Sequence, residues 1–70
     1  MVPMNVHVNG SPRELPSTSL LELLASEGIA PDARGVAVAV NDRVVTRSKW
    51  PEHTLSEGDR VEIVRATQGG

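Results

Sequence analysis

The residues with the clearest chemical potential are the two glycines that end the sequence, Gly69 and Gly70. A terminal glycine presents an unhindered carboxylate to an enzyme. Glycine also adopts backbone conformations closed to other residues, so such an end can pass through a narrow channel. A frayed terminus is the alternative interpretation, because the last residues of many domains are poorly ordered. The dipeptide alone leaves both interpretations open.

Other side chains give little indication of a catalytic or metal site. The chain has no cysteine, which excludes disulfides, thiolate metal sites and cysteine nucleophiles. His7 and His53 have no metal-ligand spacing, and His7 falls on the polar phase of a predicted strand, which favours a solvated sheet position. The sequence offers no way to assemble a catalytic triad. We therefore expect no metal and no catalytic residue, and any sulfur handled by the chain would have to sit on its terminal carboxylate.

Length and composition predict one small domain with a modest core. The chain has 70 residues, of which 39% are hydrophobic, and Trp50 is the only aromatic residue. The formal net charge is -2 and the seven basic residues are scattered, so nothing forms a basic patch for nucleic acid or anionic lipid. The sequence contains no membrane-spanning stretch and no signal-peptide pattern. We expect a soluble cytoplasmic protein.

The N-terminal region has the pattern of a β-hairpin. Residues 4–8 alternate between apolar and polar types, as a half-buried strand does. The Asn9-Gly10 pair that follows is a strong signal for a tight turn. Residues 11–15 can return as the second strand, and Pro12 favours an edge position because an edge strand tolerates a missing N–H.

One helix is well indicated. Ser19 and Glu22 fit a capping box, in which Ser19 is the N-cap and the Glu22 side chain reaches back to it. Gly28 is the expected residue after the helix, and Pro31 prevents its continuation. The predicted helix has an apolar stripe of four leucines, which are Leu20, Leu21, Leu23 and Leu24.

The C-terminal half predicts three more strands. These are residues 35–40, 43–46 and 60–67, with a turn at Asn41-Asp42 and a loop at 48–53 that includes one tight helical turn. One helix against one face of a mixed sheet is an α+β architecture, and this element order is that of the β-grasp (ubiquitin-like) fold. We expect a β-grasp domain over residues 1–67 and a flexible Gly-Gly tail over residues 68–70.

Several segments, taken in order, resemble the ThiS family of thiamin-biosynthesis sulfur carriers. They run through nearly the whole chain, from the Asn9-Gly10 hairpin and the start of the helix to the Gly-Gly tail. In the C-terminal half the likeness rests on Val38-Ala39-Val40-Asn41, Val44-Val45, Trp50, Glu57-Gly58-Asp59 and Gly69-Gly70.

This resemblance implies a carrier and not an enzyme. An E1-like activating enzyme of the ThiF type would adenylate the Gly70 carboxylate with MgATP, while Gly69 lets the tail thread into its site. Persulfide sulfur from a donor such as a cysteine desulfurase would then displace AMP. The resulting thiocarboxylate on Gly70 would serve a thiazole synthase of the ThiG type. No bound cofactor is implied, only the covalent acyl-adenylate and thiocarboxylate states.

Three alternatives to the thiamin carrier are consistent with parts of the sequence. The small subunit of molybdopterin synthase is also a β-grasp carrier, but its last strand usually approaches the tail with a Pro-Pro-Val-type segment. The corresponding segment of this chain, residues 64–68, is Val-Arg-Ala-Thr-Gln. A conjugating modifier is disfavoured because Lys49 is the only lysine available for chain building. A purely structural β-grasp module is disfavoured by the Gly-Gly tail.

The strands also predict a surface for partners. If the alternating valines and Ile63 face the helix, a small apolar strip faces away from it and leads to the tail. Arg60 and Arg65 would add charge beside it. Trp50 is expected to pack its segment onto the sheet and not to anchor an interface. The predicted partner interface is Ala37, Ala39, Val64, Arg65 and Ala66.

Overall fold

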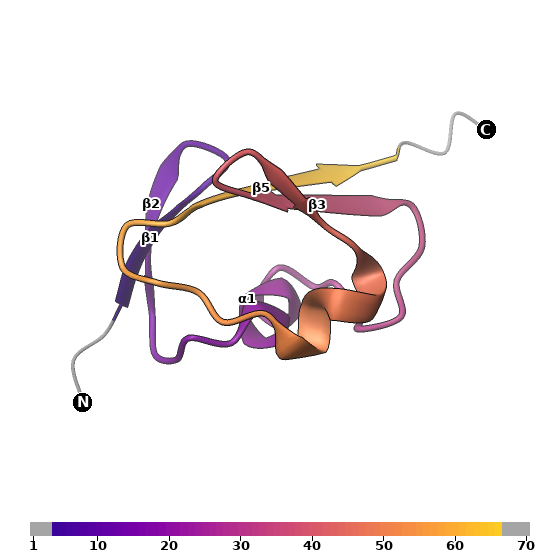
Figure 1. The fold of residues 1–70 in the computed structure, drawn as a ribbon, viewed down its shortest axis with the longest axis horizontal. Coiled ribbons are helices and arrows are strands. Elements are labelled where there is room, and N and C mark those ends of the chain that lie inside the picture. Colours follow the sequence, from indigo (N-terminus) through magenta and orange to yellow (C-terminus); the bar gives the residue numbers. More distant parts are fainter. Residues whose placement is uncertain (1–3, 67–70) are drawn as a thin grey trace.

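The computed structural model describes residues 4–66. It contains a five-stranded sheet in the order β2-β1-β5-β3-β4. Strand β1 pairs with β5 in parallel, and the other pairs are antiparallel, so the sheet is mixed as expected. Helix α1 lies on one face of this sheet (Figure 1). The elements are β1 Met4–Val8, β2 Ser11–Leu15, α1 Leu20–Ser26, β3 Val36–Val40, β4 Arg43–Val45, the 3₁₀ helix η1 Arg47–Glu52 and β5 Arg60–Arg65.

Both hairpins turn through two residues with positive φ. Asn9 and Gly10 have φ of 50° and 84°, and Asn41 and Asp42 have φ of 51° and 70°. Positive φ at both central positions defines the type I′ turn, whose twist matches that of the flanking strands. Asparagine and aspartate tolerate this conformation better than most residues. Both predicted turns are confirmed, and Pro12 lies on the edge strand β2 as expected.

The start of α1 confirms the predicted N-cap but not the reciprocal half of the capping box. The hydroxyl oxygen of Ser19 accepts a hydrogen bond from the backbone N–H of Glu22 at 3.2 Å. The N–H of Ser19 donates to Oγ of Ser17, also at 3.2 Å, where the prediction had the Glu22 carboxylate. The expected role of the Glu22 side chain is therefore wrong, because a nearer hydroxyl satisfies the same donor.

The end of α1 is a Schellman motif centred on Gly28. This glycine has a φ of 79°, in the left-handed region that L side chains rarely adopt. Its N–H donates to the carbonyl of Ala25 at 3.0 Å, and the N–H of Ile29 donates to the carbonyl of Leu24 at 2.9 Å. These are the two hydrogen bonds of the motif, and they satisfy carbonyls that the helix leaves free.

We predict that Ser19→Ala lowers the free energy of unfolding by about 1 kcal/mol, because the first turn of α1 loses the acceptor for the Glu22 N–H. Denaturant unfolding of both proteins measures the loss. Ser48→Ala is the matched control and should cost almost nothing, since within residues 4–66 the one side-chain hydrogen bond of Ser48 is with the exposed Thr46 hydroxyl. Equal stability of Ser19→Ala and the wild type would show that the cap contributes nothing.

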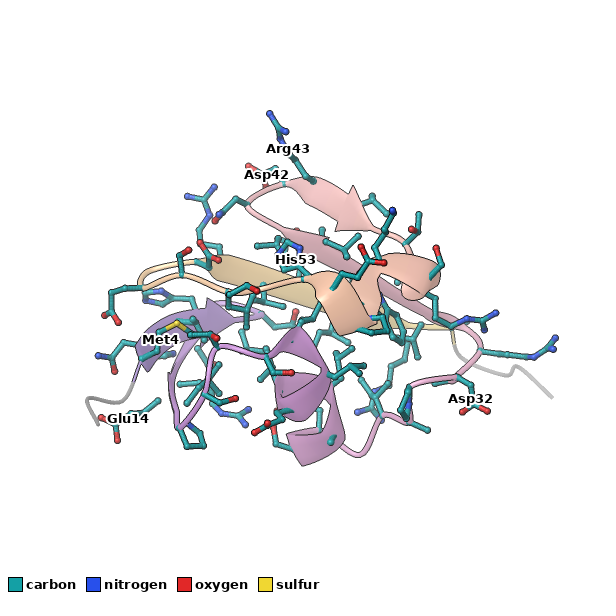
Figure 2. All side chains as sticks on the ribbon, turned by 60° about the horizontal axis from the view of Figure 1, so that its bottom comes forward. Met4, Glu14, Asp32, Asp42, Arg43 and His53 are labelled. Atoms are coloured by element: carbon teal, nitrogen blue, oxygen red, sulfur yellow. The ribbon has the colours of Figure 1, made fainter. Side chains whose placement is uncertain are left out.

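The core lies between α1 and the sheet, with charged side chains such as Glu14, Asp32 and Asp42 around the outside (Figure 2). Trp50 on η1 is 1% exposed, and its indole N–H donates to the carbonyl of Val45 at 2.9 Å. Trp50 therefore packs the connecting segment onto the sheet, as predicted. The buried residues are Met4, Val6, Val8, Leu15, Leu20, Leu23, Leu24, Ile29, Val38, Val40, Trp50, Leu55 and Val61.

Candidate functional site

Strand β5 leads to the predicted reactive tail. It lies in the middle of the sheet, between β1 and β3, and ends at Arg65, two residues before the predicted boundary. Gly69 and Gly70, and with them the tail predicted at residues 68–70, lie outside the described residues. The structure thus describes strand β5, which precedes the tail, and the surface around the end of this strand.

Two contacts hold the end of β5 against the rest of the domain. The N–H of Ala66 donates to the carbonyl of Gly35 at 2.6 Å. The guanidinium of Arg65 donates to the backbone carbonyl of Glu27, at the C-terminal end of α1. A cation is favourable there because the helix dipole places partial negative charge at that end. The chain therefore leaves the sheet from a point that both the helix and β3 hold in place.

The asparagines of the two hairpin turns also hold β5. The side-chain amide of Asn9 accepts from the N–H of Ile63 at 2.8 Å and donates to the carbonyl of Ile63 at 3.2 Å. Oδ1 of Asn41 accepts from the N–H of Arg60 at 2.9 Å. Sequence analysis identified these asparagines only as turn formers. Their long-range bonds were not predicted, because local sequence does not say which strand lies beside each turn.

The predicted apolar strip is present on the face of the sheet opposite α1. Ala37 on β3 lies directly opposite Val64 on β5, and the side chain of Val64 is 64% exposed. Ala39 is also on this face, opposite Val44 of β4, which is 75% exposed. We call Ala37, Ala39, Val44 and Val64 the outer strip. Ala66 is exposed just beyond the end of β5.

Val44 is the member of the outer strip that sequence analysis missed. The signal was available, because a two-residue turn at Asn41-Asp42 places residue 40 opposite 43 and therefore Ala39 opposite Val44. The exposed Val44 and Val64 lie on the strands on either side of β3, and with Ala37 and the half-buried Ala39 between them they form a continuous apolar surface.

Arg65 does not lie with the strip. Residues along a strand alternate between faces, so Arg65 shares the helix face with Val61 and Ile63, and its guanidinium reaches the end of α1. The structure thus separates Arg65 from Val64, although both were predicted for one interface. Arg60 is on the outer face, where it lies opposite His7 and forms an ion pair with Asp42 at 3.2 Å.

The two histidines lie on different elements. His7 is exposed on β1, on the outer face, while His53 is half-buried after η1. Within residues 4–66, no three histidine or carboxylate side chains gather as a metal site would require. No helix in the same residues is long and apolar enough to cross a membrane.

Comparison with known proteins identifies relatives of the whole domain. A curated relative, "Sulfur carrier protein ThiS" of Thermus thermophilus, is 38% identical over 65 residues, covering 93% of this chain and 98% of that protein. The crystal structure of the thiamine biosynthesis protein ThiS from Geobacter metallireducens is 34% identical, with a TM-score of 0.76, over 96% of this chain and all of that one. This likeness confirms the predicted β-grasp fold.

A third relative is a longer protein of a different name. A thiazole synthase of Paramagnetospirillum magneticum is 33% identical over 67 residues, which are 96% of this chain but 20% of that protein. The ThiS family profile itself matches residues 6–70, and so includes the two terminal glycines. On these grounds the chain belongs to the ThiS family.

Proposed function

We propose that this chain carries sulfur for thiazole formation in thiamin biosynthesis, as a thiocarboxylate on Gly70. The observation that carries the proposal is the family match through residue 70, which joins a ThiS domain to a Gly-Gly end. The fold supports it, because the central strand β5 leads toward that end. The chain acts in this reaction as a carrier and co-substrate and not as a catalyst.

The chemistry follows from the poor reactivity of a carboxylate. An oxygen of the Gly70 carboxylate attacks the α-phosphorus of MgATP in an E1-like activating enzyme, and pyrophosphate leaves. Persulfide sulfur from a donor such as a cysteine desulfurase then attacks the acyl carbon, and AMP leaves. A thiol reduces the remaining sulfur–sulfur bond, which leaves the thiocarboxylate. Gly69 contributes slenderness, because a Cβ at this position would obstruct a narrow channel.

Thiazole synthase is the partner that would receive the sulfur. The thiazole synthase of Paramagnetospirillum magneticum contains a segment similar to nearly all of this chain. A carrier-like segment within a protein of that name supports a functional partnership between the two types of domain. The alternative, a carrier for molybdopterin synthase, would use the same tail chemistry with another acceptor.

The outer strip is the proposed docking surface for the activating enzyme and for thiazole synthase. Val44 and Val64 expose most of their side chains, and the strip lies on the strands next to the base of the tail. An interface here would bury apolar surface and bring Gly70 to the partner at the same time. Exposed Glu62 lies opposite Ala39 on the outer face, and Arg60 and His7 lie further along the same face, so polar groups stand beside the strip.

We predict that Val64→Glu weakens binding to both partners at least about tenfold but leaves the domain folded. A carboxylate is solvated on the free surface, whereas in an apolar interface it is buried without a partner. Isothermal titration calorimetry with each enzyme measures the effect, and Ser48→Glu, at an exposed position of η1, is the matched control. Unchanged binding of a folded Val64→Glu protein would place the interface elsewhere.

The carrier function is tested with the activating enzyme and MgATP. The chain should support ATP–pyrophosphate exchange. When a persulfide donor and a thiol are added, its intact mass should rise by the difference between sulfur and oxygen. Thiazole formation by added thiazole synthase then separates the thiamin carrier from the molybdopterin alternative. A chain that is never adenylated by a ThiF-type enzyme would contradict the proposal.

A further inference from the structure

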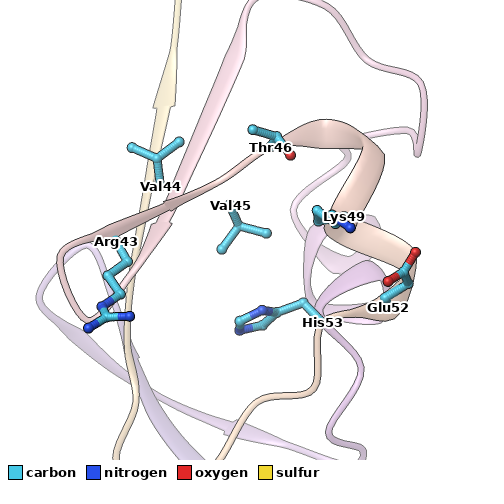
Figure 3. A pocket seen from close by; sticks show the side chains of 7 residues that line it. All are labelled: Arg43, Val44, Val45, Thr46, Lys49, Glu52 and His53. Carbon is cyan, nitrogen blue, oxygen red and sulfur yellow. The ribbon is translucent and has the colours of Figure 1, made fainter.

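A hollow of about 400 Å³ lies on the far side of the domain from β2, between the edge strand β4 and η1 (Figure 3). Its lining includes Arg43 and Val45 from β4, Lys49 and Glu52 from η1, and His53 just after η1. We call it the β4 groove. Val44 of the outer strip also lines this groove, but neither the carrier tail nor the docking role of the outer strip accounts for its charged residues.

The backbone of β4 offers unpaired hydrogen-bonding groups at this groove. Val40 and Arg43 flank the two-residue turn, so they form a hydrogen-bonded pair, and the next pair, Ala39 and Val44, does not exchange hydrogen bonds. The N–H and C=O of Val44 therefore point away from β3, toward the open edge. Within residues 4–66 no strand pairs with β4 on that side. An added strand would find a donor and an acceptor on one residue.

The other edge of the sheet is less suited to an added strand. Strand β2 carries Pro12, which has no N–H to donate, and Pro12 is followed by the charged residues Arg13 and Glu14. Proline and charged side chains are the usual means by which an edge strand avoids pairing with another chain. The β4 segment Arg43–Val45 has two valines and no proline. Of the two edges, β4 is therefore the better site for pairing with an added strand.

The side chains of the groove favour an acidic occupant. Arg43 lies at one end, and the half-buried ring of His53 points toward it across the groove (Figure 3). Lys49 is at the other end, next to the single carboxylate, Glu52. Val45 provides an apolar wall between the two ends. Because side chains of a strand alternate, a segment paired with Val44 would place every second side chain against this wall and beside Arg43.

A second copy of the chain is a poor match for the same groove. Antiparallel pairing of two β4 strands through Val44 would bring the Arg43 end of each groove next to the Lys49 end of the other copy. Like charges placed across a new ladder are unfavourable. A foreign segment with carboxylates has the complementary charge.

We propose that the β4 groove binds an extended, acidic segment of a partner protein, which adds a strand to β4 through Val44 and places a carboxylate between Arg43 and His53. This interaction goes beyond the carrier chemistry. It uses neither glycine of the tail. Of the outer strip it uses only Val44, through its backbone, and it leaves Ala37 and Val64 free.

Peptide titrations of the ¹⁵N-labelled chain, followed by NMR, test the proposal. The probe is a six-residue peptide of alternating valine and glutamate, blocked at both ends, and the matched peptide has glutamine in place of glutamate. We expect saturable shifts of the Val44, Thr46 and His53 amides. The glutamine peptide should bind about fivefold more weakly, as the loss of exposed charge pairs implies. Shifts confined to β2, equal binding of both peptides, or no shifts at all would overturn the proposal.

Two variants locate the binding to the edge of β4. Val44→Pro removes the outward N–H and no hydrogen bond to β3, so the glutamate peptide should no longer bind, while Val44→Ala keeps the N–H and should bind as the wild type does. If Val44→Pro fails to fold, Arg43→Gln replaces it and should reduce binding of the glutamate peptide to that of the glutamine peptide. Full binding by folded Val44→Pro, or by Arg43→Gln, contradicts the proposal, as does self-association of the free chain through β4 in analytical ultracentrifugation.

Discussion

Deletion of Gly70 should abolish both ATP–pyrophosphate exchange and the gain of sulfur. The deletion moves the terminal carboxylate back by one residue, about 3.3–3.6 Å along an extended chain. Adenylation requires the carboxylate oxygen close to the α-phosphorus, and reacting atoms must approach to about 3–3.5 Å. An error of one residue is therefore as large as the whole approach distance. Extension of the chain beyond Gly70 should have the same effect, because the carboxylate is then on another residue.

The same deletion should leave the fold unchanged, which separates chemistry from stability. The contacts that hold the end of β5 involve Arg65, Ala66, Glu27 and Gly35, and none of them requires Gly70. Thermal melting of the shortened chain should match that of the wild type. Adenylation of the Gly70-deleted chain at the wild-type rate would refute the proposed site.

Gly69→Val is the companion variant at the neighbouring position. It keeps the terminal carboxylate in register but adds a branched side chain to the tail. We expect slower exchange with an unchanged melting temperature, and Gly69→Ala should be impaired less. A valine variant as active as the wild type would show that the channel of the activating enzyme does not exclude a side chain at position 69.

The features that sequence alone predicted well are those with a local physical cause. Asn9 and Gly10 adopt the positive φ that their turn requires. The Ser19 side chain caps the N–H three residues ahead in α1, and Gly28 ends this helix in the left-handed region. Each of these is decided within a few residues. The alternation of β1 and β3 likewise gave the correct buried face, because one side of each strand must pack against α1.

The features that sequence did not predict depend on distant neighbours or on competition between nearby groups. The side chains of Asn9 and Asn41 bond to β5, more than fifteen residues away in the chain. The backbone N–H of Ser19 was predicted to bond the Glu22 carboxylate, but it donates to the hydroxyl of Ser17, which is equally close in sequence. Arg65 was predicted to share the partner interface with its neighbour Val64. Side chains of a strand alternate between faces, however, so Arg65 lies on the helix side of the sheet. Its long side chain then finds the end of α1, which no local pattern indicates.

The candidate site divides in the same way. Gly69 and Gly70 were selected by residue type and by family resemblance, and they remain predictions because they lie outside the described residues. The apolar strip followed from alternation and is present, with Val44 added by the register of the β3–β4 hairpin. The β4 groove was not predicted, since it needs both the edge position of β4 and the placement of η1 beside it.

Leu24→Ala should lower the free energy of unfolding by about 2–5 kcal/mol, the usual range for truncation of a buried leucine. Leu24 is 0% exposed and lies on the face of α1 that packs against the core. Alanine is the better helix former, so the substitution does not weaken the helix itself, and the loss reports packing alone. The carbonyl of residue 24 still accepts from the N–H of Ile29 after the change, because that bond involves only the backbone.

Leu21→Ala is the matched control, since it removes the same atoms from the same helix at a half-buried position. Its cost should be clearly smaller than that of Leu24→Ala. Denaturant unfolding measures both, and the midpoints are comparable if the slope with denaturant stays constant. For a domain of 70 residues the total stability is small, about 5 kcal/mol at the low end of the usual range, so a loss near the upper end of the expected range would leave a population of unfolded chains that is visible without denaturant. A greater loss at Leu21 than at Leu24 would mean that α1 presents a different face to the sheet.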